Sequence, residues 1–289
     1  MNKGKFKKKL ALYSIYAVLI FMTIIILFPL FVTLMSAFNT SNTLYSTSLI
    51  PENFSFVENF QRLFSETEYL SWYKNTFGVS IAAMLLATAI ITVMGYVYSR
   101  YRFKGRKMTL TLLLVIQIIP SGSTLIALYA IAQSLGIYSS QNSTMYTYMF
   151  LTLIYAVGAI PMNTLLMKGY YDSIPRELDE SAKIDGATHF QVFKQILIPL
   201  VKPMIAVTAL FTFLAPIGDI IMPNFLVAGA ASADKTLALG LNGLIADPTN
   251  QSYNLFAAGS ILVAIPAILL FYKFQKYIVG GLTDGGVKG

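Results

Sequence analysis

The 289-residue chain contains no cysteine, one histidine and one tryptophan, and few of its residues carry charge. The absence of cysteine excludes disulfide scaffolds, thiol catalysis and cysteine-ligated metals. Charged residues make up 12% of the sequence, whereas soluble domains carry about a quarter. No polar stretch is long enough to fold as a soluble domain. With 56% hydrophobic residues and a mean hydropathy of +0.64, this scarcity of charge predicts a protein dissolved mainly in lipid.

Several chemical constellations are also missing from the sequence. There is no Gly-x-x-x-x-Gly-Lys-Ser/Thr loop, so the chain is not expected to bind ATP itself. His189 has no companion ligands for a metal site and is interpreted as a docking or solvated residue. The apolar runs hold no paired carboxylates, histidine cluster or nucleophile constellation, which disfavours a membrane-embedded enzyme. We therefore expect no catalytic residue, metal or cofactor in this chain.

Long apolar runs dominate what is present. A run of about 20 residues can cross the ~30 Å hydrocarbon core as a helix. The predicted fold class is an all-α membrane protein with six transmembrane helices, at residues 10–38, 76–99, 108–133, 145–167, 201–223 and 256–277. The first run follows five lysines, but it is too long for a signal peptide and no small-x-small cleavage site closes it. It is interpreted as a retained span.

The basic residues are distributed unevenly between the two sides of this bundle. Five precede the first span, five lie between the second and third, five lie between the end of the fourth and the start of the fifth, counting Lys202, and three lie near the C-terminal end. Only Arg62, Lys74 and Lys235 fall elsewhere. Because cytoplasmic segments collect Lys and Arg, both termini are predicted to be cytoplasmic. This inner collar also accounts for the net charge of +8 without nucleic acid.

The predicted organisation follows from these spans. Residues 1–9 form a basic cytoplasmic tail, residues 10–279 a six-span domain, and residues 280–289 a cytoplasmic C-terminal tail. An external connection covers residues 39–75, and Trp72 near its end is expected at the membrane interface. A second external loop covers residues 224–255, and a polar cytoplasmic loop covers residues 168–200.

The polar cytoplasmic loop carries clear helix signals. Pro175 suits the first position of a helix, and acidic residues follow it in the first turns, where the helix dipole favours them. Gly186 can adopt the left-handed conformation that ends a helix, and Thr188 with Gln191 forms a capping-box pair that starts another. The pattern predicts two short helices bent at a glycine. It is compatible with a docking surface or with a loop that lies passively on the lipid headgroups.

Residue identities favour docking. Glu180-Ser181-Ala182, three residues, Gly186, nine residues and then Ile196-Leu197-Ile198-Pro199 closely resemble the EAA loop of ABC-importer permeases. Two positions depart from the family pattern, with Ser181 in place of alanine and Ile198 in place of leucine. The string DGATHFQVFKQILIP looks like the carbohydrate branch of this family. Its place between spans four and five also matches.

Three further strings resemble maltose-importer permeases of the MalG type. They are residues 281–289, the residues from Ile217 to Pro223, and Leu128-Tyr129-Ala130. The resemblance implies the bundle of a type I ABC importer permease, in a multi-pass subunit of the bacterial cytoplasmic membrane. It implies import of maltose or maltodextrin by a transport subunit that is not itself an enzyme. Permeases of this family also carry galacto-oligosaccharides, lactose or glycerol phosphate, and these alternatives remain open.

The resemblance also implies partners and site residues. The partners are a second, MalF-like permease, two ABC ATPases that bind ATP and Mg²⁺, an extracellular sugar-binding protein and the lipid bilayer. The loop 224–255 is expected to enter the binding protein's sugar cleft. Contacts to an ATPase are expected from the C-terminal Thr283, Gly285, Gly286 and Lys288. The expected coupling residues are Glu180, Ser181, Ala182, Asp185, Gly186, Phe190, Phe193, Ile196 and Leu197, with the last four as an apolar face.

Polar residues within the spans are candidates for the translocation path. Asp219, Gln117 and Asn163 either line such a path or make structural contacts between helices. A secondary transporter is the main alternative from another class. It would need its own ion relay, for which Asp219 is the only clear acidic candidate, and it would leave the polar loop unexplained.

Overall fold

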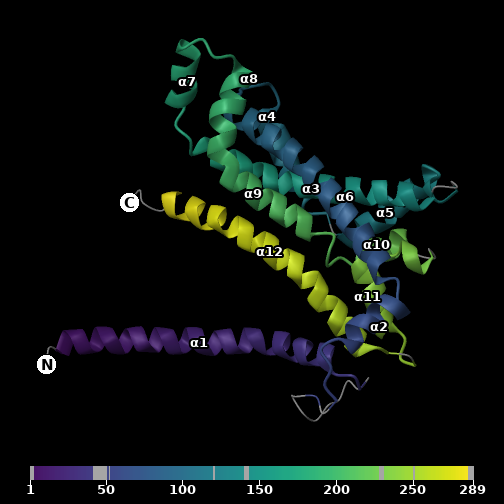
Figure 1. The fold of residues 1–289 in the computed structure, drawn as a ribbon. Helices are drawn as coiled ribbons and strands as arrows, with labels where there is room; N and C mark the ends of the chain where they lie inside the picture. The colour runs from purple at the N-terminus through teal and green to yellow at the C-terminus, as the bar shows by residue number, and fades with distance from the viewer. Residues whose placement is uncertain are drawn as a thin grey trace. The chain divides into compact units, whose positions relative to one another are not determined.

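A computed structural model describes residues 3–41, 51, 53–119, 121–139, 143–227, 231–249 and 251–285 (Figure 1). These residues form helices and turns, and their only extended pairing is an isolated bridge between Asn39 and Phe54. The all-α prediction is therefore confirmed. The α-helices are α1 (Lys3–Phe38), α2 (Glu58–Glu66), α3 (Tyr69–Arg100), α4 (Arg106–Ile116), α5 (Ser121–Ser134), α6 (Ser143–Asp172), α7 (Glu177–Ile184), α8 (His189–Gln191), α9 (Ile198–Leu214), α10 (Ile221–Leu226), α11 (Leu237–Ala246) and α12 (Tyr253–Gly285).

Five helical segments among the described residues are long and apolar enough to cross a membrane. They are Ala11–Phe38, Tyr69–Arg100, Ser143–Asp172, His189–Leu214 and Tyr253–Gln275. The run at 108–133 differs from the prediction, because it is divided between α4 and α5 by a turn at residues 117–119. Residue 120 is a proline, which cannot donate a backbone hydrogen bond and disfavours helical geometry in the residue before it.

The fifth predicted span is shifted along the chain. The helix begins at His189 within the polar loop and ends at Leu214, instead of covering residues 201–223. Residues 192–197 form a π-helical segment between α8 and α9, in which the Ile198 N–H donates to the Phe193 carbonyl. Pro199 follows this change of hydrogen-bond pattern, where its missing N–H is most easily accommodated. The second half of the polar loop and the span therefore form one continuous helical segment.

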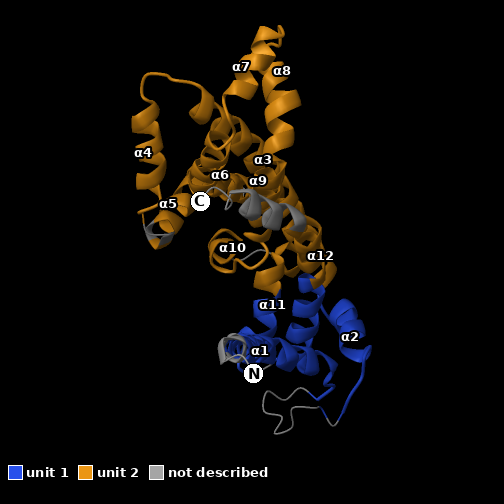
Figure 2. Ribbon diagram, turned by 90° about the vertical axis from the view of Figure 1, so that its left-hand side faces the viewer, with its two compact units in different colours: residues 1–67, 241–264 blue, residues 68–240, 265–289 orange. Residues whose placement is uncertain are grey.

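The chain divides into two compact units, coloured separately in Figure 2. Unit 2 contains residues 68–240 and 265–289, and α3, α6 and α9 pack together at its centre. Its apolar core joins Ile91 of α3, Met167 and Tyr171 of α6, and Leu197 and Val201 of the helix that follows the polar loop. Buried apolar contact between these three helices therefore extends from the bundle into the loop.

A glycine permits the close approach of α3 and α6. A Cβ atom placed on Gly95 would lie 2.4 Å from Met167 Cγ and 2.9 Å from Met167 Cβ. It would also lie 3.3 Å from the backbone nitrogen of Lys168. No side chain larger than hydrogen fits there unless the helices move apart.

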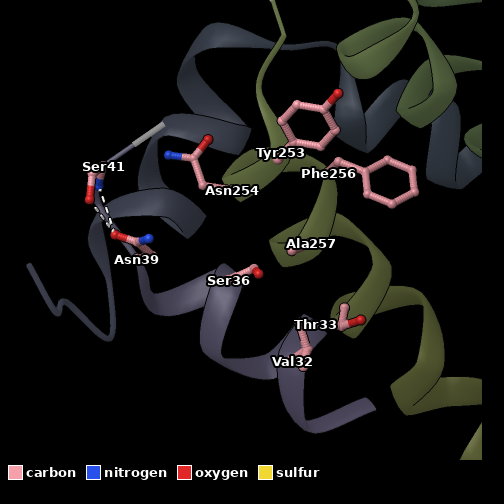
Figure 3. A pocket seen from close by; sticks show the side chains of 9 residues that line it. All are labelled: Val32, Thr33, Ser36, Asn39, Ser41, Tyr253, Asn254, Phe256 and Ala257. Carbon is pink, nitrogen blue, oxygen red and sulfur yellow. Dashed lines mark hydrogen bonds between the residues drawn. The ribbon is translucent and has the colours of Figure 1, made fainter. Parts of the chain in front are cut away.

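Unit 1 contains residues 1–67 and 241–264, and the buried Asn59 of α2 lies at its centre. The Asn59 amide donates to the carbonyls of Ala37 and Asn39 at 2.9 and 2.7 Å, and it accepts from Asn254 at 3.1 Å. These bonds join the end of α1 to α2 and to the beginning of α12. A pocket of about 140 Å³ lies beside them (Figure 3), lined by Val32, Thr33, Ser36, Asn39, Ser41, Tyr253, Asn254, Phe256 and Ala257.

Candidate functional site

The polar loop folds as a two-helix hairpin, as its local signals predicted. We call residues 177–197, comprising α7, the turn at Gly186, α8 and the π-helical segment, the coupling hairpin. Gly186 has a φ of +84°, the left-handed conformation that glycine adopts without strain. The Ala187 N–H donates to the Ala182 carbonyl at 2.9 Å and the Gly186 N–H to the Lys183 carbonyl at 3.0 Å. These bonds close the end of α7.

The second arm starts with the predicted capping box. The backbone N–H of Thr188 donates to the Gln191 side chain at 2.7 Å, and the backbone N–H of Gln191 donates to Thr188 Oγ1 at 3.3 Å. The first arm starts later than expected, because α7 begins at Glu177 with Arg176 as its N-cap and Pro175 before the cap. Both arms are thus fixed by bonds between near neighbours in the sequence.

One side of the coupling hairpin packs into the core of unit 2. Val192 and Leu197 are buried, and the rings of Phe193 and Tyr96 lie 4.7 Å apart between centroids. Ala182 and Ala187 are partly buried against the same core. The hairpin therefore makes direct apolar contact with the end of α3.

The other side of the hairpin is exposed. Ile184 is 87% exposed and Phe190 is 67% exposed, one on each side of Gly186. The side chains of Glu180, Ser181 and Asp185 are also exposed. The expected apolar face thus divides: Phe193, Ile196 and Leu197 face inward to different degrees, whereas Phe190 projects from the tip. The sequence interpretation did not single out Ile184.

Three basic residues near the hairpin form specific hydrogen bonds or ion pairs with neighbouring elements. Arg106 Nε donates to the Tyr98 carbonyl at 2.9 Å, and Arg176 donates to the Ser99 carbonyl at 3.1 Å. Arg100 forms a buried ion pair with Asp179 of α7. Charge counting could assign these residues to one side of the membrane, but it could not identify their partners.

The structure places the three path candidates in local polar contacts. Asp219 Oδ1 accepts from the backbone N–H groups of Ile221 and Met222 at the start of α10, and Oδ2 accepts from the Tyr155 hydroxyl at 2.9 Å. Gln117 directly follows α4, and its side-chain amide donates to the Leu113 carbonyl at 3.2 Å. The Asn163 amide donates to the Ala159 carbonyl, one turn earlier in α6, at 2.8 Å. The three residues do not share a cluster.

The opposite end of unit 2 holds the beginning of the external loop. The indole N–H of Trp72 donates to the Ser232 carbonyl at 2.6 Å, and the Asn75 amide donates to the Ala233 and Lys235 carbonyls. Trp72 is 4% exposed, so its ring anchors this segment within unit 2, and its place at the membrane interface stays a prediction. A Cβ atom on Gly240 would lie 2.2 Å from the indole ring.

The last part of the external loop belongs to unit 1. There the Asp247 carboxylate accepts from the hydroxyl of Thr249 at 2.7 Å and from its backbone N–H at 2.9 Å. These hydrogen bonds hold the pKa of Asp247 below its ordinary value. Asp247 therefore keeps its negative charge at neutral pH.

The C-terminal candidates fall partly outside the described residues. The helix α12 continues to Gly285, so the backbone at Thr283 and Gly285 is helical. Gly286 and Lys288 lie beyond the described residues.

Fold and site together define a class: a helical protein with several membrane spans, whose bundle carries a partly exposed two-helix hairpin at one end. A family model described as "Binding-protein-dependent transport system inner membrane component" matches residues 91–283. The chain belongs to this family, as the EAA-like spacing predicted. Members are membrane components of transport systems and not enzymes.

Three similar proteins extend this assignment. The maltodextrin transport permease MdxG of Bacillus subtilis (strain 168) is 45% identical over 274 residues, covering 95% of each chain. The galactooligosaccharide transport permease GanQ of the same organism is 44% identical, over 99% of this chain and 98% of that protein. A chain from a bacterial ABC transporter that imports alginate has the same fold, with a TM-score of 0.76, 19% identity, and coverage of 94% of this chain and 97% of that one.

Proposed function

We propose that this chain is a membrane subunit of an ATP-driven importer of maltodextrin-type oligosaccharides. Its coupling hairpin transmits the closure of partner ATPases to the bundle, which then alternates between inward-open and outward-open states. The observation that carries the proposal is the two-sided hairpin: Leu197 is fully buried in the core, while Ile184 and Phe190 project from the tip. Exposed apolar side chains on an otherwise polar segment are typical of a docking surface.

The proposed machine needs several partners. The sequence has no ATP-binding loop, so two ABC ATPases supply the energy and bind ATP and Mg²⁺. A second permease completes the pathway, and the family description supports an extracellular binding protein that delivers the sugar. Glu180, Ser181 and Asp185 are the polar contacts to the ATPase, and the segment from Thr283 to Lys288 is a second contact.

We further propose six membrane crossings with both termini in the cytoplasm, and α4 with α5 as the third crossing. Arg106, at the start of α4, bonds to Tyr98 at the hairpin end of unit 2. Ala132 and Ile137, in and after α5, pack with Val79 and Leu151 near the opposite ends of α3 and α6. The two short helices together therefore run from one end of the unit to the other.

The docking assignment is tested by Ile184→Ser in the full complex. Burial of an isoleucine side chain is worth roughly 1.5–3 kcal/mol, so we expect this variant to weaken ATPase association by about tenfold or more. Leu135→Ser is the matched control, because Leu135 is 65% exposed and lies outside the hairpin. Copurified ATPase per permease is the measurement. Equal recovery from both variants and the wild type would show that the tip does not dock.

The energy source is tested separately, by measuring the uptake of labelled maltotriose into vesicles that contain the whole importer. ATP-driven uptake is expected to persist when an ionophore removes ion gradients. A secondary transporter would behave in the opposite way, with uptake that survives loss of the ATPases and collapses with the ionophore.

The two relatives differ in their sugars, so galacto-oligosaccharides are the second candidate cargo. Competition for labelled maltotriose uptake by unlabelled maltodextrins and by galacto-oligosaccharides distinguishes the two candidates. Stronger competition by the galacto-oligosaccharides would reject the maltodextrin assignment and leave the coupling mechanism intact.

A further inference from the structure

A charged joint connects the coupling hairpin to the end of α3. Arg100 is the last residue of α3, and Asp179 lies in the first turn of α7. Arg100 Nε lies 2.7 Å from Asp179 Oδ2, and the two side chains are 7% and 9% exposed. A buried charge is costly without a partner, so the two side chains are held together. Each charge also suits its helix, with a cation at the C-terminus of α3 and an anion at the N-terminus of α7.

The same arginine ties α6 into the joint. Its two terminal nitrogens donate to the carbonyls of Tyr171 and Ile174 at 3.0 and 3.1 Å. Ser99, the preceding residue, donates to Asp172 at 2.6 Å. The ends of α3 and α6 and the start of α7 are therefore joined by contacts that all involve Ser99 or Arg100.

Asp179 differs from the other residues of α7 in its burial. It is the one buried residue of that helix, whose eight residues the structure describes completely. Of the apolar side chains of α7, only the small Ala182 packs against the core, since Leu178 is 42% exposed and Ile184 is 87% exposed. The base of the first arm is thus held to the bundle by the Asp179 carboxylate and by the hydrogen bond from Arg176 to Ser99, whereas the second arm is held by apolar packing.

We propose that the Arg100–Asp179 ion pair positions α7 so that displacement of the docked hairpin is transmitted to α3. The inference rests on the proposed function and adds positioning residues that lie behind the docking surface. A force applied at the tip moves the first arm as a lever only if the arm's base is fixed to a span. Without the ion pair, α7 rotates about the turn at Gly186 and its displacement is not transmitted to α3.

The test is Asp179→Asn in the complete importer, assayed for uptake of labelled maltotriose and for ATP hydrolysis. The amide keeps the shape of the side chain and removes the charge. We expect sugar transported per ATP hydrolysed to fall by at least about fivefold, the lower end of ordinary coupling between sites, while ATP hydrolysis continues. Glu177→Gln is the matched control, because it makes the same change at an exposed position of the same turn, and its ratio should equal that of the wild type.

The exchanged pair Arg100→Asp with Asp179→Arg provides a second readout, because it restores opposite charges in reversed order. It should recover part of the transport ratio that either single reversal loses. An unchanged ratio in Asp179→Asn overturns the inference, and so does failure of that variant to assemble with the ATPases, because the pair would then serve folding alone. A wild-type importer whose uptake needs no ATP rejects the proposed function instead.

Discussion

Gly186 is the residue at which backbone geometry most directly limits substitution. Its φ of +84° is costly for residues with a Cβ, but no atom lies within 4 Å of the position where a Cβ would stand. The cost of a larger residue is therefore conformational, about 1–2 kcal/mol, and not a clash with a neighbour. We expect Gly186→Val to distort the bend of the coupling hairpin and lower uptake per ATP hydrolysed.

Gly186→Asn separates this explanation from a simple intolerance to side chains. Asparagine adopts the left-handed conformation more readily than other residues with a Cβ, and the space around Gly186 is open. The asparagine variant should therefore retain most of the uptake that the valine variant loses. Equal losses in the two variants, measured at equal amounts of assembled complex, would contradict a purely conformational role.

Residues whose partners are near in sequence were predictable. The turn at Gly186 and the Thr188–Gln191 capping box depend on bonds that span a few residues, so local pattern was sufficient. Phe190 was assigned to the same apolar face as Phe193 and Leu197, because helical periodicity identifies a face but not where the neighbouring helices end. Asp219 could have been identified as a local cap from its place before α10, whereas its partner Tyr155 is 64 residues away and leaves no sequence signal.

At the scale of elements, the contact between α3 and α6 depends on Gly95. Gly95→Ala would place a Cβ 2.9 Å from Met167 Cβ and 3.3 Å from the Lys168 backbone. Such overpacking costs about 1–3 kcal/mol, so we expect a lower unfolding temperature in detergent. Gly158→Ala in α6 is the matched control, since nothing lies within 4 Å of its added Cβ. Because alanine has a higher helix propensity than glycine, the Gly158→Ala variant should unfold at the same or a slightly higher temperature than the wild type.

The assembly of α1, α2 and α12 within unit 1 depends on the buried Asn59. Asn59→Ala removes three hydrogen bonds and leaves the Ala37 and Asn39 carbonyls without that donor. A buried polar group left unsatisfied costs about 1–3 kcal/mol, so limited proteolysis within α2 should become faster. Gln61→Ala, at an exposed position of the same helix, should leave the rate unchanged.

Apolar run length predicted the existence of these elements better than their boundaries. The run 108–133 is mostly apolar, yet it is divided into α4 and α5. The proline at residue 120 and the polar residues 121–124 were the available signals. The helix from His189 to Leu214 joins the second arm of the hairpin directly to a span. Sequence reasoning ended the loop at residue 200 and began the span at residue 201, because it did not anticipate the π-helical segment at residues 192–197.

For the whole molecule, the distribution of basic residues predicted which connections share a side, but not the contacts that they make there. Arg100, Arg106 and Arg176 do lie together at the hairpin end of unit 2, where each bonds to a neighbouring element. In the proposed topology, the positive charge of these residues places this end in the cytoplasm. Their bonds join the spans to the coupling hairpin.

The proposed third crossing consists of two helices that are each too short to span the membrane alone, and thiol labelling tests it. The sequence has no cysteine, so single cysteines can be introduced without background. Lys104 precedes α4 and Ser134 is the last residue of α5, and both side chains are exposed. The variants Lys104→Cys and Ser134→Cys therefore place one thiol at each end of the proposed crossing. If α4 and α5 together form one crossing, an impermeant thiol reagent added to intact cells should label Ser134→Cys and not Lys104→Cys.

Ser181→Cys in the hairpin is the cytoplasmic control and should react only after the membrane is opened. Identical labelling at positions 104 and 134 would mean that α4 and α5 return to the side from which they entered, and the six-crossing topology would be wrong.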